Sequence, residues 1–461
     1  MSFVFPLDLM VSVSGFRGRV GQPITPELVS FLAAGFGTFL GKTGAGGPIL
    51  LGRDSRTSGA MLARSATAGL QSVGCDVVDL GVVPTPTLLL AVEDAGAAGG
   101  IGVTASHNPG EWNALKFATG EGTFLDARAM EAFQNLLLGE DPARASWLDI
   151  GSVRLDSGAV ERHLERILTL SFLDLPALKD RAFRVALDCV HGAGGVVMPQ
   201  LLGALGCEVV GIGIEPHGRF SRDPEPTAEN LAELGQLVRE TGADLGMAVD
   251  PDVDRLALVD GLGTPLGEDL TLALASAVAL RRKTGVVVTN LSTSQVVEDV
   301  ARRYGGSVVR SPVGEIHVAR RMQEENAVVG GEGNGGVILP DLHFTRDAPV
   351  GAALILQHLL DEGCGLREAA SRWPGYVIRK RKVSFSREAL GGAYEALESD
   401  LSPPEADRAD GLRLAWRKER AWLHVRPSGT EPVVRLIAEA PSGKKADALL
   451  ARAEEILLGL A

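Results

Sequence analysis

Residues 48–59 read PILLGRDSRTSG, an apolar stretch typical of a β-strand that ends in a loop of glycine and polar residues. A helical stretch follows over 60–73, and a second apolar strand follows Gly74 in the sequence GCDVVDLG. The same order of strand, loop, helix and strand returns twice, beginning at 184–187 and at 285–288. This order is the βαβ pattern, so the sequence predicts three related α/β domains with mixed, mostly parallel sheets.

Each of the three units is followed by one more apolar strand that ends in a polar loop. The loops are TASHNP (104–109), DPDVDR (250–255) and GEGNGG (331–336). In open α/β sheets, ligands bind outside the carboxyl ends of the strands. Three equivalent strand ends with three different polar loops therefore predict one central cleft that is assembled from three domains.

The last ninety residues have a different pattern. Residues 411–440 alternate apolar and polar side chains between short turns, as antiparallel strands do, and 442–460 form an amphipathic helical stretch. This part predicts a C-terminal α+β domain. We expect four domains, with limits at 1–150, 151–256, 257–372 and 373–461.

Composition and charge exclude several classes of protein. A chain of 461 residues exceeds what one hydrophobic core supports. The net charge of −13 argues against a nucleic-acid partner, although local arginines can still hold an anionic substrate. The longest apolar run, 270–280, is too short to span a membrane and predicts a core helix. The four cysteines show no metal-binding spacing. We expect a cytoplasmic monomer or homodimer with no membrane partner.

The loop DPDVDR places Asp250, Asp252 and Asp254 at alternate positions after a buried strand. Alternate side chains of an extended segment point the same way, and three carboxylates held so close repel one another unless a cation lies between them. Hard oxygen ligands suit Mg²⁺. The alternative is a solvated acidic turn; an EF-hand is excluded because Arg255 stands where that motif needs glycine.

Three further stretches have both a functional and an ordinary structural interpretation. The turn RPSGTEP (426–432) is either a phosphate-binding nest or a plain hairpin turn. The loop GEGNGG offers Glu332 and Asn334 to sugar hydroxyls, or is only a mobile glycine loop. The arginines of SGFRGRVG and GRDSRTSG either contact an anion or are solvated; they are Arg17, Arg19, Arg53 and Arg56.

Ser106 lies at the end of a strand, in the loop TASHNP, and no GxSxG or SxxK pattern surrounds it. The common serine-hydrolase arrangements are therefore absent, and a simple turn serine remains an alternative. A serine at one strand end, an aspartate triad at another and a phosphate nest together indicate a serine that carries phosphate, with Mg²⁺ neutralising the phosphoryl oxygens.

These motifs resemble those of the α-D-phosphohexomutase family, which interconverts sugar 1-phosphates and 6-phosphates. TASHNP is similar to the phosphoserine loop, DPDVDR to the metal loop, GEGNGG to the sugar-recognition loop and RPSGTEP to the phosphate-binding loop. The order and spacing of the four motifs agree along the whole chain. The resemblance implies three related α/β domains and a C-terminal α+β domain around a central cleft.

The resemblance also implies a role for each matching residue. Ser106 would be phosphorylated and, with the three aspartates, would hold one Mg²⁺. Arg17 and Lys116 would assist proton transfer at the reacting hydroxyls, and Arg255 would contact the phosphoserine region. Glu332 and Asn334 would bind sugar hydroxyls. The non-reacting phosphate would lie against Arg426, Ser428, Gly429 and Thr430. A bisphosphorylated hexose would be the intermediate and activator.

Two features bear on which sugar is used. RPSGTEP, and the pairing of EWNALK with GEGNGG, look more like phosphoglucosamine mutases than like phosphomannomutase/phosphoglucomutases, which remain the alternative. The chain also departs from its relatives: Ala114 stands where most have glycine, and Gly336 where many have a sugar-loop histidine. His343 is close enough in sequence to be a substitute for that histidine.

Two other classes of function compete with the mutase. A Mg²⁺-dependent sugar phosphatase with Asp250 as nucleophile also fits an aspartate directly after a strand, but it leaves Ser106 without a role. A non-catalytic sugar-phosphate sensor is the third hypothesis, although Ser106, Lys116 and the three aspartates that catalysis needs are all present.

Overall fold

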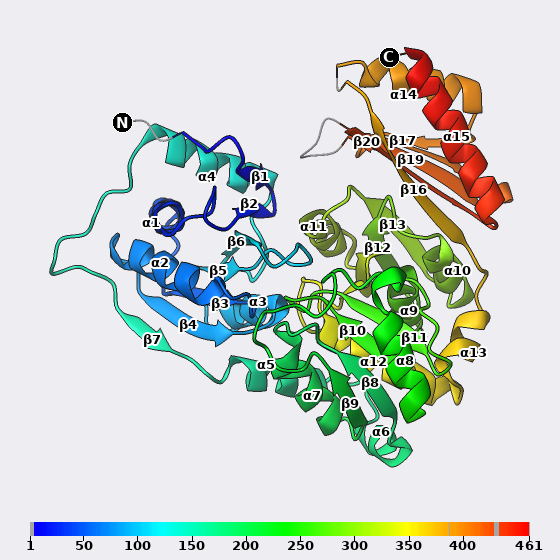
Figure 1. Ribbon diagram of the computed structural model, residues 1–461, viewed down its shortest axis with the longest axis horizontal. Coiled ribbons are helices and arrows are strands. Elements are labelled where there is room, and N and C mark those ends of the chain that lie inside the picture. The colour runs from blue at the N-terminus through cyan, green and yellow to red at the C-terminus, as the bar shows by residue number, and fades with distance from the viewer. Residues whose placement is uncertain (1–3, 387, 428–432, 461) are drawn as a thin grey trace.

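The computed structural model describes residues 4–386, 388–427 and 433–460. Figure 1 shows the α/β domains as two masses, the N-terminal one in blue and the other two in green and yellow, with the C-terminal domain in orange and red beside them. The described strands form four sheets, three of them in α/β domains and the fourth in the C-terminal domain. The predicted fold class is therefore confirmed.

One strand order recurs in the first three sheets. It is β4-β3-β5-β6 within domain I, β9-β8-β10-β11 in domain II and β13-β12-β14-β15 in domain III. In each unit the first three strands are parallel and the last is antiparallel to its neighbour. The repeated sequence pattern thus folds into a repeated sheet, and the loop before each antiparallel strand occupies an equivalent place in all three domains.

Domain I extends this unit to seven strands by adding the antiparallel β1 and β2 at one edge and β7 at the other. Its strands are β1 (Met10–Ser12), β2 (Gly15–Arg19), β3 (Ile49–Arg53), β4 (Val77–Val82), β5 (Gly99–Val103), β6 (Trp112–Thr119) and β7 (Val153–Leu155). Its helices are α1 (Pro26–Thr43), α2 (Gly59–Gln71), α3 (Thr85–Asp94) and α4 (Ala127–Gly139).

Domains II and III each keep the four-stranded sheet. Domain II contains β8 (Arg184–Asp188), β9 (Glu208–Ile212), β10 (Leu245–Val249), β11 (Leu256–Asp260), α5 (Ala159–Leu168), α6 (Leu175–Arg181), α7 (Gly194–Ala204), η1 (Ala228–Asn230) and α8 (Ala232–Thr241). Domain III contains α9 (Asp269–Arg282), β12 (Val286–Asn290), α10 (Val296–Arg303), β13 (Ser307–Ser311), α11 (Glu315–Glu325), β14 (Val329–Glu332), β15 (Gly336–Ile338), α12 (Ala348–Glu362) and α13 (Leu366–Ser371).

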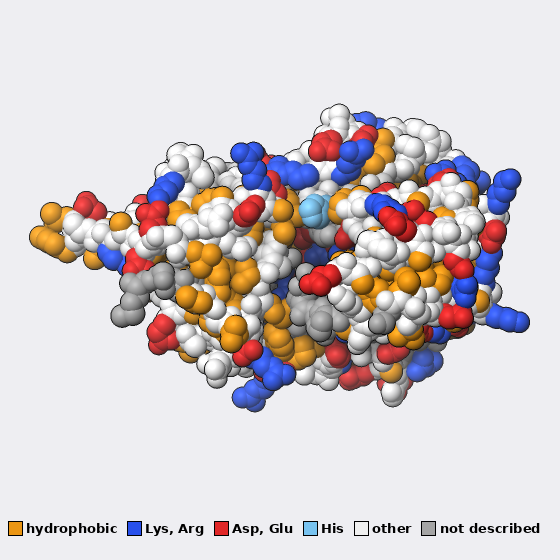
Figure 2. Space-filling model, turned by 90° about the horizontal axis from the view of Figure 1, so that it is seen from above, with side chains coloured by type: hydrophobic (Ala, Val, Ile, Leu, Met, Phe, Trp, Pro, Cys, Tyr) orange, Lys and Arg blue, Asp and Glu red, His pale blue; other side chains and the backbone are white. Residues whose placement is uncertain are grey.

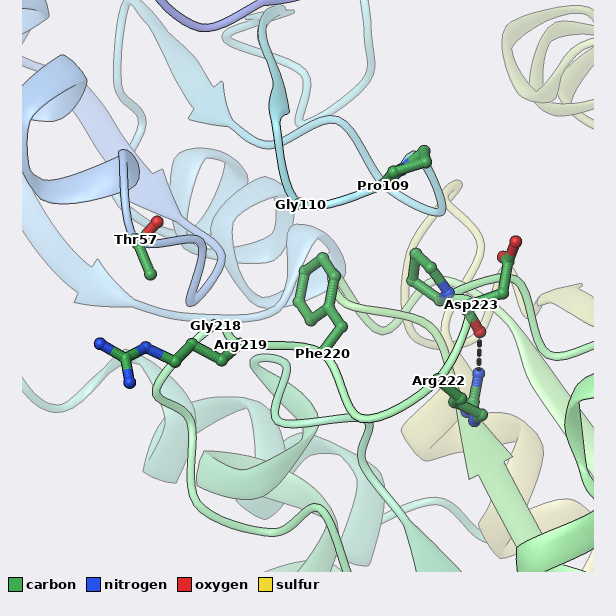
Figure 3. A pocket seen from close by; sticks show the side chains of 9 residues that line it. Thr57, Pro109, Gly110, Gly218, Arg219, Phe220, Arg222 and Asp223 are labelled. Carbon is green, nitrogen blue, oxygen red and sulfur yellow. Dashed lines mark hydrogen bonds between the residues drawn. The ribbon is translucent and has the colours of Figure 1, made fainter.

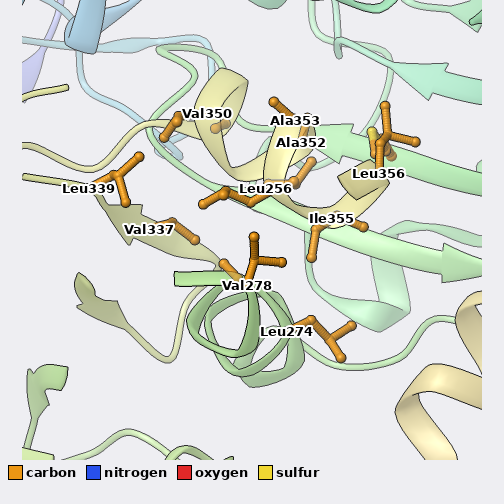
Figure 4. Packing of buried hydrophobic residues seen from close by; sticks show 14 of the residues in the cluster. Leu256, Leu274, Val278, Val337, Leu339, Val350, Ala352, Ala353, Ile355 and Leu356 are labelled. Atoms are coloured by element: carbon orange, nitrogen blue, oxygen red, sulfur yellow. The ribbon is translucent and has the colours of Figure 1, made fainter. Parts of the chain in front are cut away.

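Domains II and III share one hydrophobic core around helices α9 and α12. Residues 271–280 of α9 and 348–359 of α12 are buried on every face, as expected for helices that lie between two layers. Figure 4 shows Leu274 and Val278 of α9 packed with Ile355 of α12 and with Leu256 of domain II. The predicted core helix at 270–280 is confirmed, and the shared core fixes the metal loop of domain II against domain III.

Domain IV is an antiparallel sheet in the order β16-β20-β19-β18-β17 with two helices. Its elements are β16 (Val377–Ser384), α14 (Leu390–Leu401), β17 (Glu405–Asp407), β18 (Leu412–Trp416), η2 (Arg417–Glu419), β19 (Ala421–Pro427), β20 (Val433–Ala440) and α15 (Gly443–Leu460). The helical stretch expected at the C-terminus is α15.

Two sheets extend slightly past the expected limits at 150 and 256. Strand β7 adds to the edge of the first sheet as far as Leu155, and β11 completes the hairpin with β10 as far as Asp260. The three-residue β7 is exposed throughout and is too short for its sequence pattern to predict a strand. None of the helices that the structure describes is long and apolar enough to cross a membrane.

The close packing of α1 and α2 in domain I depends on Gly69. A Cβ at this position would lie 2.2 Å from the carbonyl oxygen of Ser30, whereas a Cβ at the helical Gly203 would meet nothing within 4 Å. We expect Gly69→Ala to destabilise the protein by about 1–3 kcal/mol through overpacking. Gly203→Ala, the matched control, should be neutral or stabilising by about 0.5–1 kcal/mol. Thermal denaturation of the two variants checks this, and equal midpoints would contradict it.

Candidate active site

The three equivalent loops meet at one place, although they come from three sheets. The hydroxyl of Ser106, after β5, donates a 2.8 Å hydrogen bond to Oδ2 of Asp250, after β10. The guanidinium of Arg346 contacts both Asp254 of the second loop and Glu332 at the end of β14. The structure therefore brings together the predicted phosphoserine, metal and sugar loops. Figure 2 shows a hollow near the middle of the molecule in which basic and acidic side chains are visible.

Ser106 is 3% exposed and has a φ of 49°, in the left-handed region that non-glycine residues rarely adopt. Its backbone N–H donates to the hydroxyl of Thr104 at 3.0 Å. This conformation directs the serine hydroxyl to Asp250. A strained backbone that surrounding contacts hold in place is typical of functional loops.

His107 lies beside the serine, with its Nδ1 3.4 Å from the Ser106 hydroxyl. The positive charge of Arg255, burial and the charge of Arg17 together lower the pKa of His107 to about 2. The imidazole is therefore neutral at pH 7. Sequence reasoning gave this residue no role, because neighbouring side chains at a strand end usually diverge.

The loop that carries Ser106 is held from behind by Arg56. This guanidinium donates to four carbonyl oxygens, those of Ser106 (2.6 Å), Asn108 (2.6 Å), Pro109 (2.6 Å) and Trp112 (3.0 Å). It is 1% exposed and also pairs with Asp54, whose carboxylate accepts from Thr104 at 2.6 Å. The alternative that Arg56 binds a substrate anion is wrong: its donors are used within the protein.

The three aspartates are fully buried, and atoms of all three lie within 4.8 Å of one another. Oδ2 of Asp252 accepts from Lys116 and from Thr85, both at 2.8 Å. Oδ1 of Asp250 accepts from the backbone N–H groups of Asp254 (3.1 Å) and Arg255 (3.2 Å). Within the described part of the chain, Oδ1 of Asp252 and Oδ1 of Asp254 are buried without a hydrogen-bond partner.

These free oxygens fit a divalent cation. Burial and the charges of Asp254 and Asp252 raise the pKa of Asp250 well above its ordinary value. Although burial raises the pKa of Asp252, the Lys116 ammonium and the hydrogen bonds to its carboxylate bring that pKa below its ordinary value. A hard cation would accept the orphaned oxygens as ligands and relieve the repulsion, and Mg²⁺ prefers such oxygens.

The other predicted catalytic residues surround this triad. Lys116 on β6 is 4% exposed, with its Nζ on Asp252. Arg17 on β2 donates to Oδ1 of Asn108 at 2.6 Å, and burial lowers its pKa. Arg255 pairs with Glu225 at 2.9 Å, and its Nε lies 3.7 Å from Asp254. Ala114 is buried on β6, opposite Arg17 of β2.

Glu332 is the last residue of β14, and Asn334 lies in the loop between β14 and β15. The carboxylate of Glu332 accepts from Nδ2 of Asn290 at 2.8 Å, from the N–H of Gly314 at 3.0 Å and from Arg346 at 2.7 Å. Against the effect of burial, the charge of Arg346 and these hydrogen bonds lower the pKa of Glu332. Oδ1 of Asn334 accepts from the N–H of Gly336 at 3.2 Å. Asn334 is therefore held within its own loop, whereas Glu332 is held by residues of other segments.

His343 does not take the place of a sugar-loop histidine. It is 3% exposed, and its Nε2 lies 2.8 Å from Asp347, which His163 also contacts at 2.8 Å. The described contacts place Arg346, not His343, against Glu332 and Gly336. The sequence gives no sign of this arginine, because only the fold brings residue 346 beside the loop at 332–336.

In domain IV, Arg426 lies at the end of β19 and pairs with Asp410 at 3.1 Å. Ser428, Gly429 and Thr430 lie outside the described residues. A pocket of about 600 Å³ opens beside the Ser106 loop, between Thr57, Pro109 and Gly110 of domain I and residues 218–224 of domain II. Figure 3 shows Phe220 and the backbone of Gly218 facing the domain I loops across it.

Comparison with known proteins agrees with this architecture. Models of the phosphoglucomutase/phosphomannomutase family match the chain as α/β/α domain I (residues 9–143), domain II (161–263), domain III (267–376) and C-terminal domain (395–456). The chain is 38% identical over 437 residues to a probable phosphoglucosamine mutase of Methanopyrus kandleri and 37% identical over 437 residues to a phosphoglucomutase/phosphomannomutase of Thermococcus kodakarensis. Each alignment covers 94% of both chains.

Solved structures share the fold. A putative phosphomannomutase from Thermus thermophilus matches with a TM-score of 0.84 at 26% identity, covering 99% of this chain and 100% of that one. An N-acetylphosphoglucosamine mutase from Aspergillus fumigatus, in complex with GlcNAc-6P and magnesium, matches with a TM-score of 0.60 at 16% identity over 99% of this chain and 96% of that one.

The fold and the family matches define a phosphotransferring isomerase that acts on hexose phosphates. The chain belongs to the phosphoglucomutase/phosphomannomutase family, the α-D-phosphohexomutases.

The buried aspartates predict that a divalent ion stabilises the fold. We expect Mg²⁺ to raise the denaturation midpoint, because an ion that binds only the native state at 100 times its Kd adds about 2.7 kcal/mol. Asp252→Asn removes one of the three charges and should abolish most of the shift. Asp260→Asn, which changes another buried aspartate outside the triad, should keep it. An unchanged shift in Asp252→Asn would place the ion elsewhere.

The contacts of Arg56 predict that it controls turnover without touching the substrate. Arg56→Met leaves four carbonyl oxygens of the Ser106 loop without their donor. We expect kcat to fall on the order of 10²-fold, because misplacing a reacting group by about 1 Å has this effect. The neighbouring Arg53→Met is the control, since within the described part of the chain Arg53 donates only to the carbonyl of Asp54. Steady-state kinetics measure both, and equal kcat values would remove Arg56 from this role.

Proposed function

We propose that this phosphohexomutase interconverts hexose 6-phosphate and hexose 1-phosphate through phosphate carried on Ser106, and that glucosamine 6-phosphate is its preferred substrate. The observation that carries the mechanism is the 2.8 Å contact between the Ser106 hydroxyl and Asp250 within a buried aspartate triad. The name of the Methanopyrus kandleri relative supports the choice of sugar.

In the first half of the reaction, the phosphorus–Oγ bond of phosphorylated Ser106 breaks and a bond to the free sugar hydroxyl forms. The hydroxyl proton leaves, and Oγ takes up a proton. The resulting hexose bisphosphate turns over in the cleft. Its other phosphate then returns to Oγ, which loses its proton, and the freed sugar oxygen gains one. The bisphosphate is both the intermediate and the activator that loads an unphosphorylated serine.

The residues around the serine divide the remaining tasks. Lys116 and Arg17 assist proton transfer at the reacting hydroxyl and hold the negative charge of the phosphoryl group. Arg255 contacts the phosphoserine region, where its charge reaches His107 and Asp254. A Mg²⁺ ion held by the three aspartates and a Ser106 phosphate oxygen would neutralise charge on the transferring group. The magnesium in the Aspergillus fumigatus complex supports this assignment.

Substrate positioning falls to the loops of domains III and IV. Glu332 and Asn334 bind sugar hydroxyls, and Arg426, Ser428, Gly429 and Thr430 hold the phosphate that does not react. Each domain thus contributes one loop to the proposed site. The phosphoserine loop comes from 1–150, the metal loop from 151–256, the sugar loop from 257–372 and the phosphate loop from 373–461. A clamp on the distant phosphate supplies binding energy at both steps.

The proposed function also includes a partner and a cellular compartment. The partner is a small phosphosugar, and we propose a cytoplasmic enzyme without nucleic-acid or membrane partners, either monomeric or homodimeric. All four cysteines are free thiols, which suits a reducing compartment. A phosphomannomutase/phosphoglucomutase activity is the second candidate, and the Thermococcus kodakarensis relative favours it. Membership of the mutase family removes the case for a phosphatase with Asp250 as nucleophile.

Parallel mutase assays test the proposal. Glucosamine 6-phosphate, glucose 1-phosphate and mannose 1-phosphate are each supplied with Mg²⁺ and a trace of the matching bisphosphate. We expect glucosamine 6-phosphate to give the highest kcat/KM, and Ser106→Ala to lower turnover about 10³-fold or more, because the group that accepts phosphate is gone.

Ser146→Ala, in an exposed segment after α4, is the matched serine control and should turn over like wild type. Faster turnover of mannose or glucose 1-phosphate would overturn the choice of sugar. Undiminished activity of Ser106→Ala would overturn the phosphoserine mechanism.

A further inference from the structure

Among the residues that the structure describes, Arg346 is the arginine whose guanidinium contacts both the metal loop and the sugar loop. One terminal nitrogen of its guanidinium contacts Oδ2 of Asp254, and the other lies 2.7 Å from Oε2 of Glu332. Its Nε lies 3.4 Å from Glu315 at the start of α11. The side chain is 9% exposed, so its charge serves buried carboxylates of domains II and III and not the solvent.

Each contact leaves the partner carboxylate in a defined orientation. Arg346 holds Asp254 through Oδ2, and Oδ1 of Asp254 remains buried with no hydrogen-bond partner among the described residues. Arg346 holds Glu332 through Oε2, while Asn290 and Gly314 hold the other oxygen. One planar group thus sets both the free oxygen of the metal triad and the carboxylate of the sugar loop.

The absence of a side chain at Gly336 follows from the same arginine. A Cβ at this position would lie 2.3 Å from Cδ and 2.9 Å from Cγ of Arg346, and 3.2 Å from Oδ1 of Asn334, with no backbone atom among its three nearest neighbours. The φ of Gly336 is not positive, so its backbone does not itself require glycine. The space that a larger residue would use is filled by the aliphatic part of Arg346.

We propose that Arg346 is a positioning residue that couples the metal loop to the sugar loop, and that Gly336 is glycine because Arg346 occupies its side-chain space. Arginine suits this task, since its planar fork makes two directed contacts at once, whereas a lysine ammonium is a compact point charge. The metal part of this inference stands on the contacts alone, and the sugar part rests on the proposed function of Glu332.

Two readouts separate this role from a general loss of stability. The first is the affinity for Mn²⁺, used as the probe ion and followed by electron paramagnetic resonance without substrate. The second is KM against kcat for the hexose phosphate. In Arg346→Lys we expect Mn²⁺ affinity to fall about 10-fold or more, as when partners that orient metal ligands are lost, and KM to rise. Arg367→Met removes an arginine from another buried aspartate, Asp260, and should change neither readout.

A double-mutant cycle tests the steric part. Gly336→Ala alone should displace Arg346 and reproduce the loss of Mn²⁺ affinity and the rise in KM. In the Arg346→Ala background, where Cγ and Cδ are absent, Gly336→Ala should add no further loss. Circular dichroism and thermal denaturation confirm that each variant is folded, and Arg346→Lys retains a charge if Arg346→Ala does not fold.

The outcomes distinguish this inference from the proposed function. Wild-type Mn²⁺ affinity in both Arg346→Lys and Gly336→Ala would overturn the coupling, and additive losses in the cycle would overturn the steric argument. A change in Mn²⁺ affinity without a change in KM would overturn the link to the sugar loop. Active Ser106→Ala would instead overturn the phosphoserine mechanism and leave the Mn²⁺ result intact.

Discussion

The structure depends on the burial of three carboxylates in one short loop. Asp250, Asp252 and Asp254 are each at most 1% exposed, and burying such charges without compensation costs several kcal/mol per ion. Arg255 and two backbone N–H groups of the same loop supply part of the compensation, and the rest comes from other domains. Domain I supplies the Lys116 ammonium and the Ser106 hydroxyl, and domain III supplies the Arg346 guanidinium. Electrostatic balance at the metal loop therefore requires that domains I, II and III assemble around it.

Two buried arginines make their contacts inside the protein, where they hold the loops of the site. Arg56 holds the Ser106 loop through its carbonyl oxygens, and Arg346 holds two loops through their carboxylates. The next residue, Asp347, also joins separate segments, because it caps the N-terminus of α12 and accepts from His163 and His343. Such rigid support suits the proposed mechanism, in which one site holds the sugar in two orientations in turn.

Much of this architecture was predictable from the sequence. The strand-loop-helix-strand pattern repeats three times, and each polar loop follows the corresponding strand, so the three α/β units and the position of their loops could be derived from periodicity alone. The spacing of the three aspartates indicated a cation site, and the structure places all three in one buried cluster. Strand β7, a short exposed edge strand, pairs with the first sheet beyond residue 150, and β11, which directly follows the aspartate loop, pairs with the second sheet up to residue 260.

The sequence by itself determined the fold class, the family and which loops carry polar groups, because these depend on local periodicity and on motifs read within a few residues. Only the tertiary structure decided which side chains compensate those groups. Lys116 and Asp252 are 136 residues apart, and Asp254 and Arg346 are 92 apart. In the same way, only the tertiary structure shows that Arg346, and not His343, lies beside the sugar loop. Charge compensation and space filling act between atoms in contact, and no local pattern in the chain reports which distant residues the packed domains bring together.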